Sequence, residues 1–310
     1  MKGVHVKTSL KFVLALLMAA AFAFEGLAAA RRAAPYVGCI VMDADTGDVL
    51  LRDKSEALAY PASVTKLMTF LLILEDMREG LYAPTDTMVA TVRATREEPS
   101  IVGIKPGESM TVNDLLISIM VKSANDAAVV LAENSSAIRA GRKGNITGAD
   151  LPAFIARMNE RAAALGMSHT RYASPNGLPP PKSNMKRGFD ESTAADLAKL
   201  ARLLVAMPET FKYTSLKMAT VTDGAGNPLR MVNHNNILVK DKLKILDTDG
   251  RSMVDGLKTG YIDAGGSSII LTGTRNGRRA IVIVLGSDKA AMRDAEARRL
   301  MVDALGAFGG

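Results

Sequence analysis

The 310-residue chain lacks several features that indicate particular classes of protein. Its single cysteine, Cys39, excludes an internal disulfide and lies in an apolar run typical of a buried strand. It has no arginine-rich arm and no nucleic-acid-binding motif, so its formal net charge of +7 does not indicate a nucleic-acid partner. Repeats and linkers are also absent, which favours one domain, and a hydrophobic content of 48% is ample for its core.

A long membrane-spanning run is lacking too, but the N-terminus has the pattern of a secretory signal peptide. Three lysines precede an apolar stretch at 12–24, and three alanines at 28–30 offer a cleavage site. The stretch is too short for an ordinary spanning helix. We therefore expect residues 1–30 to be a signal peptide, with an uncleaved anchor as the alternative, and no transmembrane domain in the mature chain. Export without disulfides favours a bacterial periplasm or cell envelope.

Removal of this leader would take away three lysines and one glutamate, which lowers the formal charge to +5. A basic mature chain suits an anionic partner such as a carboxylate-bearing polymer, although a modest basic excess is more often a solubility feature.

The chain begins and ends with β-type patterns. Two apolar runs around an Asp-Thr-Gly turn predict a hairpin over 36–51, and Asn276-Gly277 is typical of a tight turn between strands at 267–274 and 279–286. A further strand is expected at 253–261. The residues between these ends have helical patterns, at about 61–79, 115–121, 126 onward, 151–165 and 193–207, and a last helix is expected at 290–305.

This order of elements predicts an α/β (α+β) fold. Its antiparallel sheet is built from both chain ends and flanked by helices, and an all-helical lobe is inserted between them. We expect a single catalytic domain over 31–310, with a sheet lobe of about 31–60 and 212–310 and a helical lobe of about 61–211. No C-terminal β-domain is expected, because the chain stops after its last helix.

Ser63 and Lys66 are the first candidates for catalysis. They lie three residues apart near the start of the helix expected after Pro61, so they share one face. A lysine in an otherwise apolar helix becomes a base when it is desolvated, and it can then activate a neighbouring hydroxyl. The alternative is a lysine that reaches solvent beside a helix cap. Ser183 and Lys186 repeat the spacing in a polar loop, so this motif alone decides nothing.

Two further motifs complete the set of candidates. Ser123-Ala124-Asn125 lies in a tight turn between two helices, where Ser123 is either a cap or a group that points out of the helical lobe. Ser174-Pro175-Asn176 has the same spacing, so this pattern is also weak alone. Lys258-Thr259-Gly260 occurs once, on a predicted strand, where its glycine would let another backbone approach. Such a strand either ends in a solvated lysine or pairs with an extended peptide and binds its carboxylate.

In this order, the three motifs resemble the signature of the penicillin-recognising serine enzymes. Their flanking residues, such as Pro61-Ala62 before Ser63 and Asp255-Gly256-Leu257 before Lys258, are similar to those of the D-alanyl-D-alanine carboxypeptidases among the low-molecular-mass penicillin-binding proteins. The resemblance covers the chain from about Val37 to the final helix. It implies a β-lactamase/transpeptidase-like fold and an enzyme that removes the terminal D-alanine from peptidoglycan stem peptides. It also implies covalent inhibition by β-lactam antibiotics, a role in cell-wall organisation and no metal or cofactor.

The resemblance assigns a role to each matching residue. It makes Ser63 the acylated nucleophile, Lys66 its general base and Ser123 a proton relay to the leaving amine. The other matching positions would bind substrate. Asn125 would hold an amide, Lys258 would supply positive charge, Thr259 would bind the terminal carboxylate, and Gly260 completes the motif. The backbone N–H of Tyr261 would join that of Ser63 in holding the oxyanion.

One position departs from a better-known relative, which has an arginine for the substrate carboxylate upstream of the Lys-Thr-Gly strand. This chain offers His234 instead. Histidine is charged only near or below its pKa, so carboxylate binding would depend on Thr259 and Lys258, or on another arginine such as Arg230.

Other activities use the same motifs. A class A β-lactamase usually carries Glu-x-x-x-Asn, and no glutamate here has asparagine four residues on, so this alternative is minor. A D,D-endopeptidase that cleaves cross-links and a penicillin-binding sensor with negligible turnover remain open.

Overall fold

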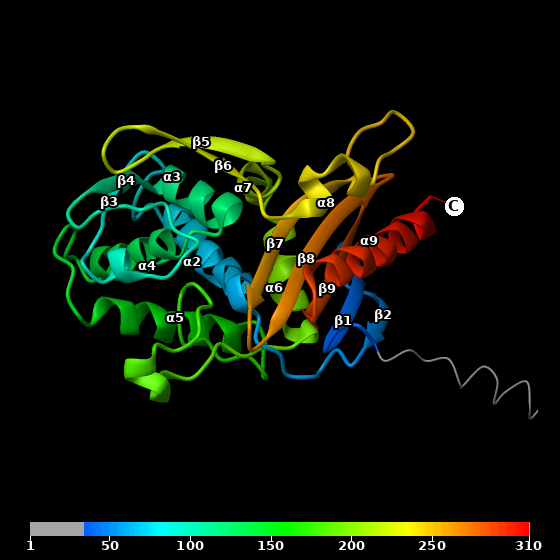
Figure 1. Cartoon of the computed structure of the whole chain (residues 1–310), viewed down its shortest axis with the longest axis horizontal. Coiled ribbons are helices and arrows are strands. Elements are labelled where there is room, and N and C mark those ends of the chain that lie inside the picture. Colours follow the sequence, from blue (N-terminus) through cyan, green and yellow to red (C-terminus); the bar gives the residue numbers. More distant parts are fainter. Residues whose placement is uncertain (1–33, 310) are drawn as a thin grey trace, which may run out of the picture. The chain divides into compact units, whose positions relative to one another are not determined.

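A five-stranded antiparallel sheet joins the two ends of the described chain, in the order β2-β1-β9-β8-β7 (Figure 1). The computed structural model describes residues 34–309, so the predicted signal peptide lies outside the described residues. The strands are β1 (Gly38–Asp43), β2 (Val49–Asp53), β7 (Val254–Ile262), β8 (Gly266–Arg275) and β9 (Arg278–Ser287). The prediction of an antiparallel sheet from both chain ends is confirmed.

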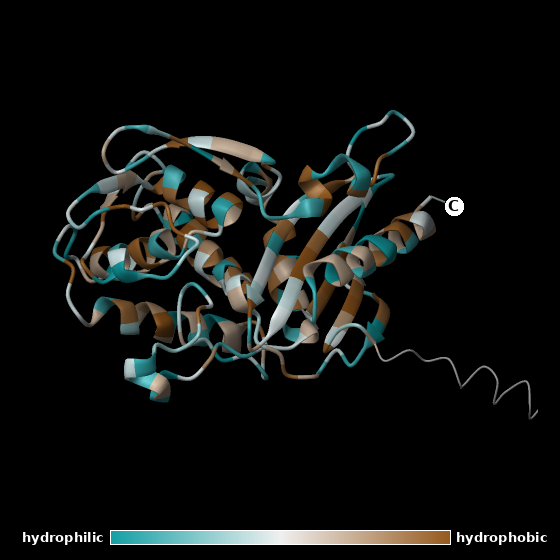
Figure 2. Cartoon of the chain, in the orientation of Figure 1, coloured by the Kyte–Doolittle hydropathy of each residue, from teal (hydrophilic) through white to brown (hydrophobic). Residues whose placement is uncertain are grey.

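The central strands β1, β9 and β8 are buried on both faces because they are apolar on both sides, whereas the edge strand β2 is exposed. Helix α9 (Ala290–Ala307) packs on one face against β8 and β9, and α6 (Ala194–Val205) packs against β1 and β9. Figure 2 shows hydrophobic residues along these central strands. Cys39 is fully buried in the cluster beneath α9, as predicted. The turn at Asn276-Gly277 has φ angles of 52° and 76°, the positive values that a type I′ hairpin requires.

Helices between the two halves of the sheet form a helical region, as predicted. They are α2 (Lys66–Arg78), α3 (Val112–Ile117), α4 (Asn125–Arg139) and α5 (Asp150–Ala164). Helix α2 is apolar almost all round and lies buried at the centre, as expected for such a helix. The side chains of Thr111 and Thr193 accept hydrogen bonds from the backbone N–H groups of Asp114 and Asp196, so each threonine caps the helix that follows it.

Two small hairpins lie outside the main sheet. The first pairs β3 (Thr87–Val89) with β4 (Ser109–Thr111), and the second pairs β5 (Met218–Thr222) with β6 (Pro228–Val232). The β5–β6 hairpin falls within the span expected to belong to the sheet lobe, but it packs on α3 and the helical region instead. The packing of this hairpin was not predicted, because packing partners are set by distant residues.

Short helical turns fill the connections. They are η1 (Ala62–Thr65), η2 (Ala94–Arg96), η3 (Ser118–Lys122), η4 (Lys182–Arg187), η5 (Pro208–Thr210), α7 (Phe211–Thr214), α8 (Asn236–Val239) and η6 (Asp241–Leu243). Within residues 34–309, none of the helices combines the length and the apolar character needed to cross a membrane.

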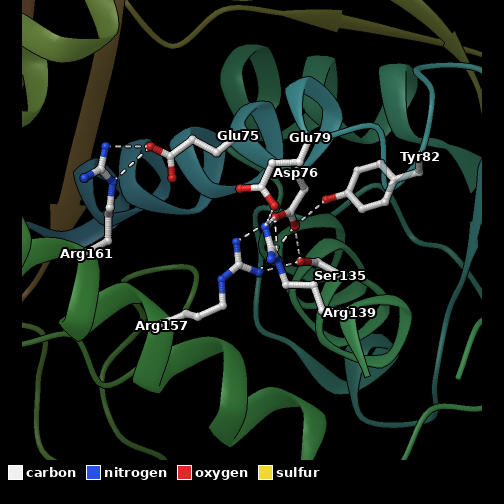
Figure 3. A network of polar contacts seen from close by, with 8 residues as sticks. All are labelled: Glu75, Asp76, Glu79, Tyr82, Ser135, Arg139, Arg157 and Arg161. Atoms are coloured by element: carbon white, nitrogen blue, oxygen red, sulfur yellow. Dashed lines mark hydrogen bonds and ion pairs between the residues drawn. The ribbon is translucent and has the colours of Figure 1, made fainter. Parts of the chain in front are cut away.

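A buried carboxylate fastens the last turn of α2 to its neighbours (Figure 3). Asp76 is fully buried and contacts the guanidinium groups of Arg139 on α4 and Arg157 on α5, at 2.6 and 2.7 Å. The hydroxyls of Tyr82 and Ser135 donate further hydrogen bonds to it. A buried charge is tolerated when it is paired and hydrogen-bonded in this way, so the Asp76 cluster holds three helices together.

Candidate active site

Ser63 and Lys66 lie where the chain enters α2. The sequence predicted an α-helix from Pro61, but residues 62–65 form a 3₁₀ turn and the α-helix begins at Lys66. Ala62 has φ +52°, in the sparsely populated left-handed region, immediately before the serine. Ser63 remains partly exposed, whereas Lys66 is 0% exposed. The alternative in which Lys66 reaches solvent is therefore wrong.

The amino group of Lys66 is surrounded by oxygen atoms. Its Nζ lies 2.8 Å from Ser63 Oγ and 2.7 Å from both Asn125 Oδ1 and the backbone oxygen of Asn176. None of these three oxygens is a carboxylate, so no direct ion pair stabilises the ammonium form. Burial, and then the positive charge of Lys258, lower the pKa of Lys66 well below its ordinary value of 10.5. The lysine can therefore be a neutral base beside a serine hydroxyl.

Ser123 and Asn125 lie between η3 and α4. Ser123 has φ 60° and ψ 31°, a left-handed conformation that ends the π-helical turn, and its side chain does not cap α4. This contradicts the alternative in which it is only an N-cap. Its Oγ accepts a hydrogen bond from Lys258 Nζ at 2.9 Å, and Asn125 Oδ1 accepts one from Lys66. The turn thus connects the lysine of α2 to the lysine of β7.

The Lys-Thr-Gly motif lies on β7, an edge strand of the main sheet. Lys258 is buried, which contradicts the alternative of a solvated strand end, and burial with the charge of Arg293 lowers its pKa to about 7. A Cβ at Gly260 would lie 2.6 Å from Pro61 O and 3.0 Å from Ser63 N. Only glycine therefore fits there, and the predicted close backbone approach is confirmed.

A cavity of about 290 Å³ opens at the junction of these elements. Seven of the nine predicted site residues line it, namely Ser63, Ser123, Asn125, His234, Thr259, Gly260 and Tyr261. The other two, Lys66 and Lys258, are buried behind it and reach its wall through Ser63 and Ser123. The structure therefore brings all nine predicted residues to one site.

The residue that offers a positive charge to a substrate carboxylate is neither His234 nor Arg230. Partial desolvation and the charge of Lys258 lower the pKa of His234 below its ordinary 6.5, so its ring is neutral at pH 7. Arg230 does not line the cavity, and its guanidinium contacts Met218 on the β5–β6 hairpin. Arg293 of α9 does line the cavity. The sequence offered no local signal for Arg293, which reaches the site from the final helix.

Tyr261 takes part through its position on β7. Its side chain is exposed and its hydroxyl donates to Asp263 Oδ1 at 2.7 Å. The predicted contribution comes from its backbone N–H, so it does not depend on this contact.

Asn176 is a further site residue that the sequence reasoning set aside. It belongs to the second Ser-x-Asn pattern, yet its backbone oxygen is 2.7 Å from Lys66 Nζ. The adjacent Gly177 packs so tightly on the Ser63 turn that a Cβ there would lie 1.9 Å from Ala62 O. The second Ser-x-x-Lys pattern, at Ser183 and Lys186, lies instead on the exposed turn η4.

These groups have the chemistry of acyl transfer through a serine ester. A partly exposed hydroxyl lies against a buried amine, a second hydroxyl bridges to another amine, and a strand edge with an arginine behind it faces the same cavity. Such an arrangement provides a nucleophile, a base, a proton relay and a place for an extended peptide with a terminal carboxylate.

Comparison with known sequences gives one family match. The model of peptidase family S11, described as D-alanyl-D-alanine carboxypeptidase, matches residues 32–289. The carboxypeptidase DacB2 of Mycobacterium tuberculosis is 31% identical over 246 residues, which cover 79% of this chain and 73% of that protein. DacF of Bacillus subtilis is 29% identical over 84% of this chain. The chain spans about three fifths of the length of several curated relatives, 60% for DacF.

Solved structures agree with the fold. A crystal structure of D-alanyl-D-alanine carboxypeptidase from M. tuberculosis is similar with a TM-score of 0.71 and 28% identity, over 90% of this chain and 93% of that one. A mutant of the Streptomyces K15 DD-transpeptidase gives a TM-score of 0.73 at 23% identity, over 87% of this chain and 98% of that one, a likeness of fold.

Proposed function

Because the chain belongs to the peptidase S11 family of D-alanyl-D-alanine carboxypeptidases, we propose that it is a serine D,D-carboxypeptidase that acts through a Ser63 acyl-enzyme. Its substrate is a peptidoglycan stem pentapeptide, from which it removes the terminal D-alanine. The observation that carries this proposal is the contact of 2.8 Å between Ser63 Oγ and the fully buried Lys66 Nζ. Such an amine is a base at neutral pH.

Acylation begins when Ser63 Oγ attacks the carbonyl carbon of the penultimate D-alanine. Lys66 Nζ takes the hydroxyl proton as the Oγ–C bond forms, and the C–N bond to the terminal D-alanine then breaks. The proton that Lys66 took passes to the leaving amine through Ser123 Oγ, which lies 2.9 Å from Lys258 Nζ, so Lys66 is neutral again before hydrolysis. The backbone N–H groups of Ser63 and Tyr261 hold the oxyanion, where each such donor contributes roughly 10²–10³ in rate in other acyl-transfer enzymes.

Hydrolysis of the ester completes the cycle. A water molecule gives a proton to Lys66 and attacks the acyl carbon, the Oγ–C bond breaks, and the proton returns to Ser63. The shortened peptide leaves with a new carboxylate. A β-lactam enters by the same attack, but its leaving amine stays tethered to the acyl group, which explains covalent inhibition by penicillin.

Substrate recognition uses the free edge of β7. An extended peptide pairs with this edge, and its terminal carboxylate lies near Thr259, Lys258 and Arg293. Arg293 is permanently charged, unlike His234, so it supplies the cation that the sequence pattern lacked. Asn125 binds a substrate amide from the opposite wall of the cavity.

The cellular setting follows from the substrate. Peptidoglycan lies in the cell envelope, so we place the mature protein in the periplasm, exported by the predicted N-terminal signal peptide.

Release of D-alanine tests this function. Purified protein is incubated with a diacetylated peptide that ends in D-Ala-D-Ala, and free D-alanine is measured beside labelling by a fluorescent penicillin. We expect both signals in the wild type and neither in Ser63→Ala. Labelling without release would favour a penicillin-binding sensor. Cleavage of cross-linked muropeptides into monomers, without release of D-alanine, would favour an endopeptidase.

A further inference from the structure

A short irregular segment outside the known motifs, residues 97–100, holds the side-chain amides of both asparagines that contact Lys66. The side chain of Glu97 accepts a hydrogen bond from Asn176 Nδ2 at 2.7 Å. The backbone oxygen of Glu98 accepts one from Asn125 Nδ2, also at 2.7 Å. For Asn125, the segment and Lys66 contact the same side-chain amide. For Asn176, the segment holds the side chain, while the backbone oxygen of the same residue contacts Lys66. We call residues 97–100 the brace segment.

The brace segment is anchored to the start of α4. The backbone oxygen of Ser100 accepts a hydrogen bond from Asn125 N at 2.7 Å. Just beyond it, the carboxylate of Asp126 accepts hydrogen bonds from the backbone N–H groups of Val102 and Gly103, at 3.0 and 2.9 Å. The segment thus has a defined position even though it has no regular secondary structure.

This arrangement determines where the lone pair of a neutral Lys66 points. A neutral amine has two N–H bonds and one lone pair, and a carbonyl oxygen can only accept. Asn125 Oδ1 and the oxygen of Asn176 take the two N–H bonds, which leaves the lone pair facing Ser63 Oγ. If either carbonyl moved, an N–H bond could turn toward the serine and the base would be misaligned.

Of these two residues, Asn176 is held by a side chain of the brace segment, so Glu97 acts on its backbone carbonyl through the side chain of the same residue. The amide of Asn176 is nearly fully buried, and besides Glu97 its side chain contacts only the N–H of Leu178, at 3.0 Å. Glu97 is half-buried, and the groups that face it are Asn176, Arg187, Lys66 and Asp126. Asn125, in contrast, is held by backbone oxygens alone.

We propose that Glu97 is a positioning residue for acylation, whose carboxylate holds Asn176 so that the lone pair of Lys66 is directed at Ser63. This proposal rests on the proposed function, because it assumes that Lys66 is the base.

The charge of Glu97 should also affect the pH dependence of acylation, which a purely structural role would leave unchanged. The charged groups around Lys66 are Lys258 on β7 and the carboxylates of Glu97, Asp190 and Asp126. Removal of one carboxylate lowers the pKa of Lys66 further. The acid limb of the pH–rate profile, which reports this pKa, then moves to lower pH.

The experiment measures the rate constant of acylation by a fluorescent penicillin against pH, in the wild type, Glu97→Ala, Glu97→Gln and a control, Glu108→Ala. Glu108, like Glu97, accepts a hydrogen bond through its carboxylate. Its donor is the backbone N–H of Lys105, which is not a site residue. We expect Glu97→Ala to acylate about tenfold more slowly or worse, as misplaced catalytic groups do. Glu97→Gln keeps the acceptor for Asn176, so it should retain most of the rate with its acid limb at lower pH. Glu108→Ala should match the wild type.

Rate constants are independent of the folded fraction, so a loss of stability alone does not imitate the expected result. A Glu97→Ala rate and profile equal to those of Glu108→Ala overturn this proposal alone, provided that the wild type is acylated and releases D-alanine. If Glu97→Ala does not fold, Glu97→Gln decides, and an unchanged acid limb overturns the proposal. A wild type that is neither acylated nor active overturns the proposed function as well.

Discussion

Helix α2 carries a buried ionisable residue at each end, and the groups that surround these two residues differ. At the last turn, Asp76 contacts two guanidinium groups and two hydroxyls (Figure 3). At the first turn, Lys66 contacts three neutral oxygens, and the neighbouring charge with the largest effect on its pKa is another cation, Lys258.

The difference teaches what a buried charge is used for. Opposite charges at the Asp76 cluster compensate its desolvation, so the cluster fastens α2, α4 and α5 together. At Lys66 the desolvation is left without a direct counter-charge, so burial lowers the pKa of the amine well below its ordinary value. One end of the helix therefore contributes stability and the other contributes reactivity.

The largest effect on activity is expected from Lys66→Met. This change removes the base and leaves a side chain of similar length in an apolar helix, so acylation should fall by about 10²–10⁴-fold. The free energy of unfolding should change less than in any variant of Asp76, because an unpaired buried amine costs stability. Penicillin acylation kinetics and urea unfolding measure the two quantities. A variant that acylates at the wild-type rate would contradict the comparison.

Asp76→Asn should show the reverse pattern. It leaves Arg157 without its counter-charge and Arg139 with Glu79 alone, and we expect a loss of roughly 2–3 kcal/mol in the free energy of unfolding. This is below the range for a fully buried pair, because both arginines keep some contact with water. The acylation rate constant of the folded protein should stay close to that of the wild type. A large loss of rate without a loss of stability would refute the structural role.

Lys258→Met tests the effect of Lys258 on the pKa of Lys66 through the pH dependence of acylation. Below about pH 7, the pKa of Lys258, its ammonium opposes a second charge on Lys66. Its removal therefore raises the pKa of Lys66, and the acid limb of acylation moves to higher pH, with the rate on that limb falling about tenfold for each pKa unit. Lys258→Arg, which keeps a charge, is the control. Movement of the acid limb to lower pH in Lys258→Met would contradict the claim that the charge of Lys258 lowers the pKa of Lys66.

The smallest effect is expected at His234. Its pKa is lowered by the same causes, desolvation and neighbouring lysines, and no carboxylate contacts it, so at pH 7 it offers no charge to the substrate. His234→Ala should raise KM for a D-Ala-D-Ala peptide by only about threefold, the scale of one neutral hydrogen bond. Arg293→Met should raise KM more. Equal effects of the two variants would mean that the histidine is charged.

Local features of the fold were predictable because local chemistry decides them. Thr111 and Thr193 cap helices through the residue three positions on, and Asn276-Gly277 forms its turn through φ angles that these residues tolerate. The prediction of where α2 begins was less accurate. Whether the chain around Ser63 forms an α or a 3₁₀ turn depends on Gly177 and Gly260, which pack against it from distant parts of the chain.

The site was predictable only as far as its motifs extend. The order of Ser63, Ser123 and Lys258 carried the resemblance, and the structure brings these residues together. Glu97 and Arg293 belong to no motif, and the Ser-x-Asn pattern of Asn176 does not predict its contact with Lys66, so each reaches the site through tertiary packing. Asn176 contributes a backbone oxygen, which any residue type possesses, so no sequence pattern distinguishes it.

The protonation state of Lys66 tests the central claim most directly. In protein labelled with ¹³C at the lysine Cε, the Lys66 resonance, assigned by its loss in Lys66→Met, is followed by NMR against pH. We predict a titration well below the ordinary pKa of 10.5 that moves upward in Lys258→Met. A Lys66 that titrates at or above 10.5 would contradict the claim that this buried amine is the base for Ser63.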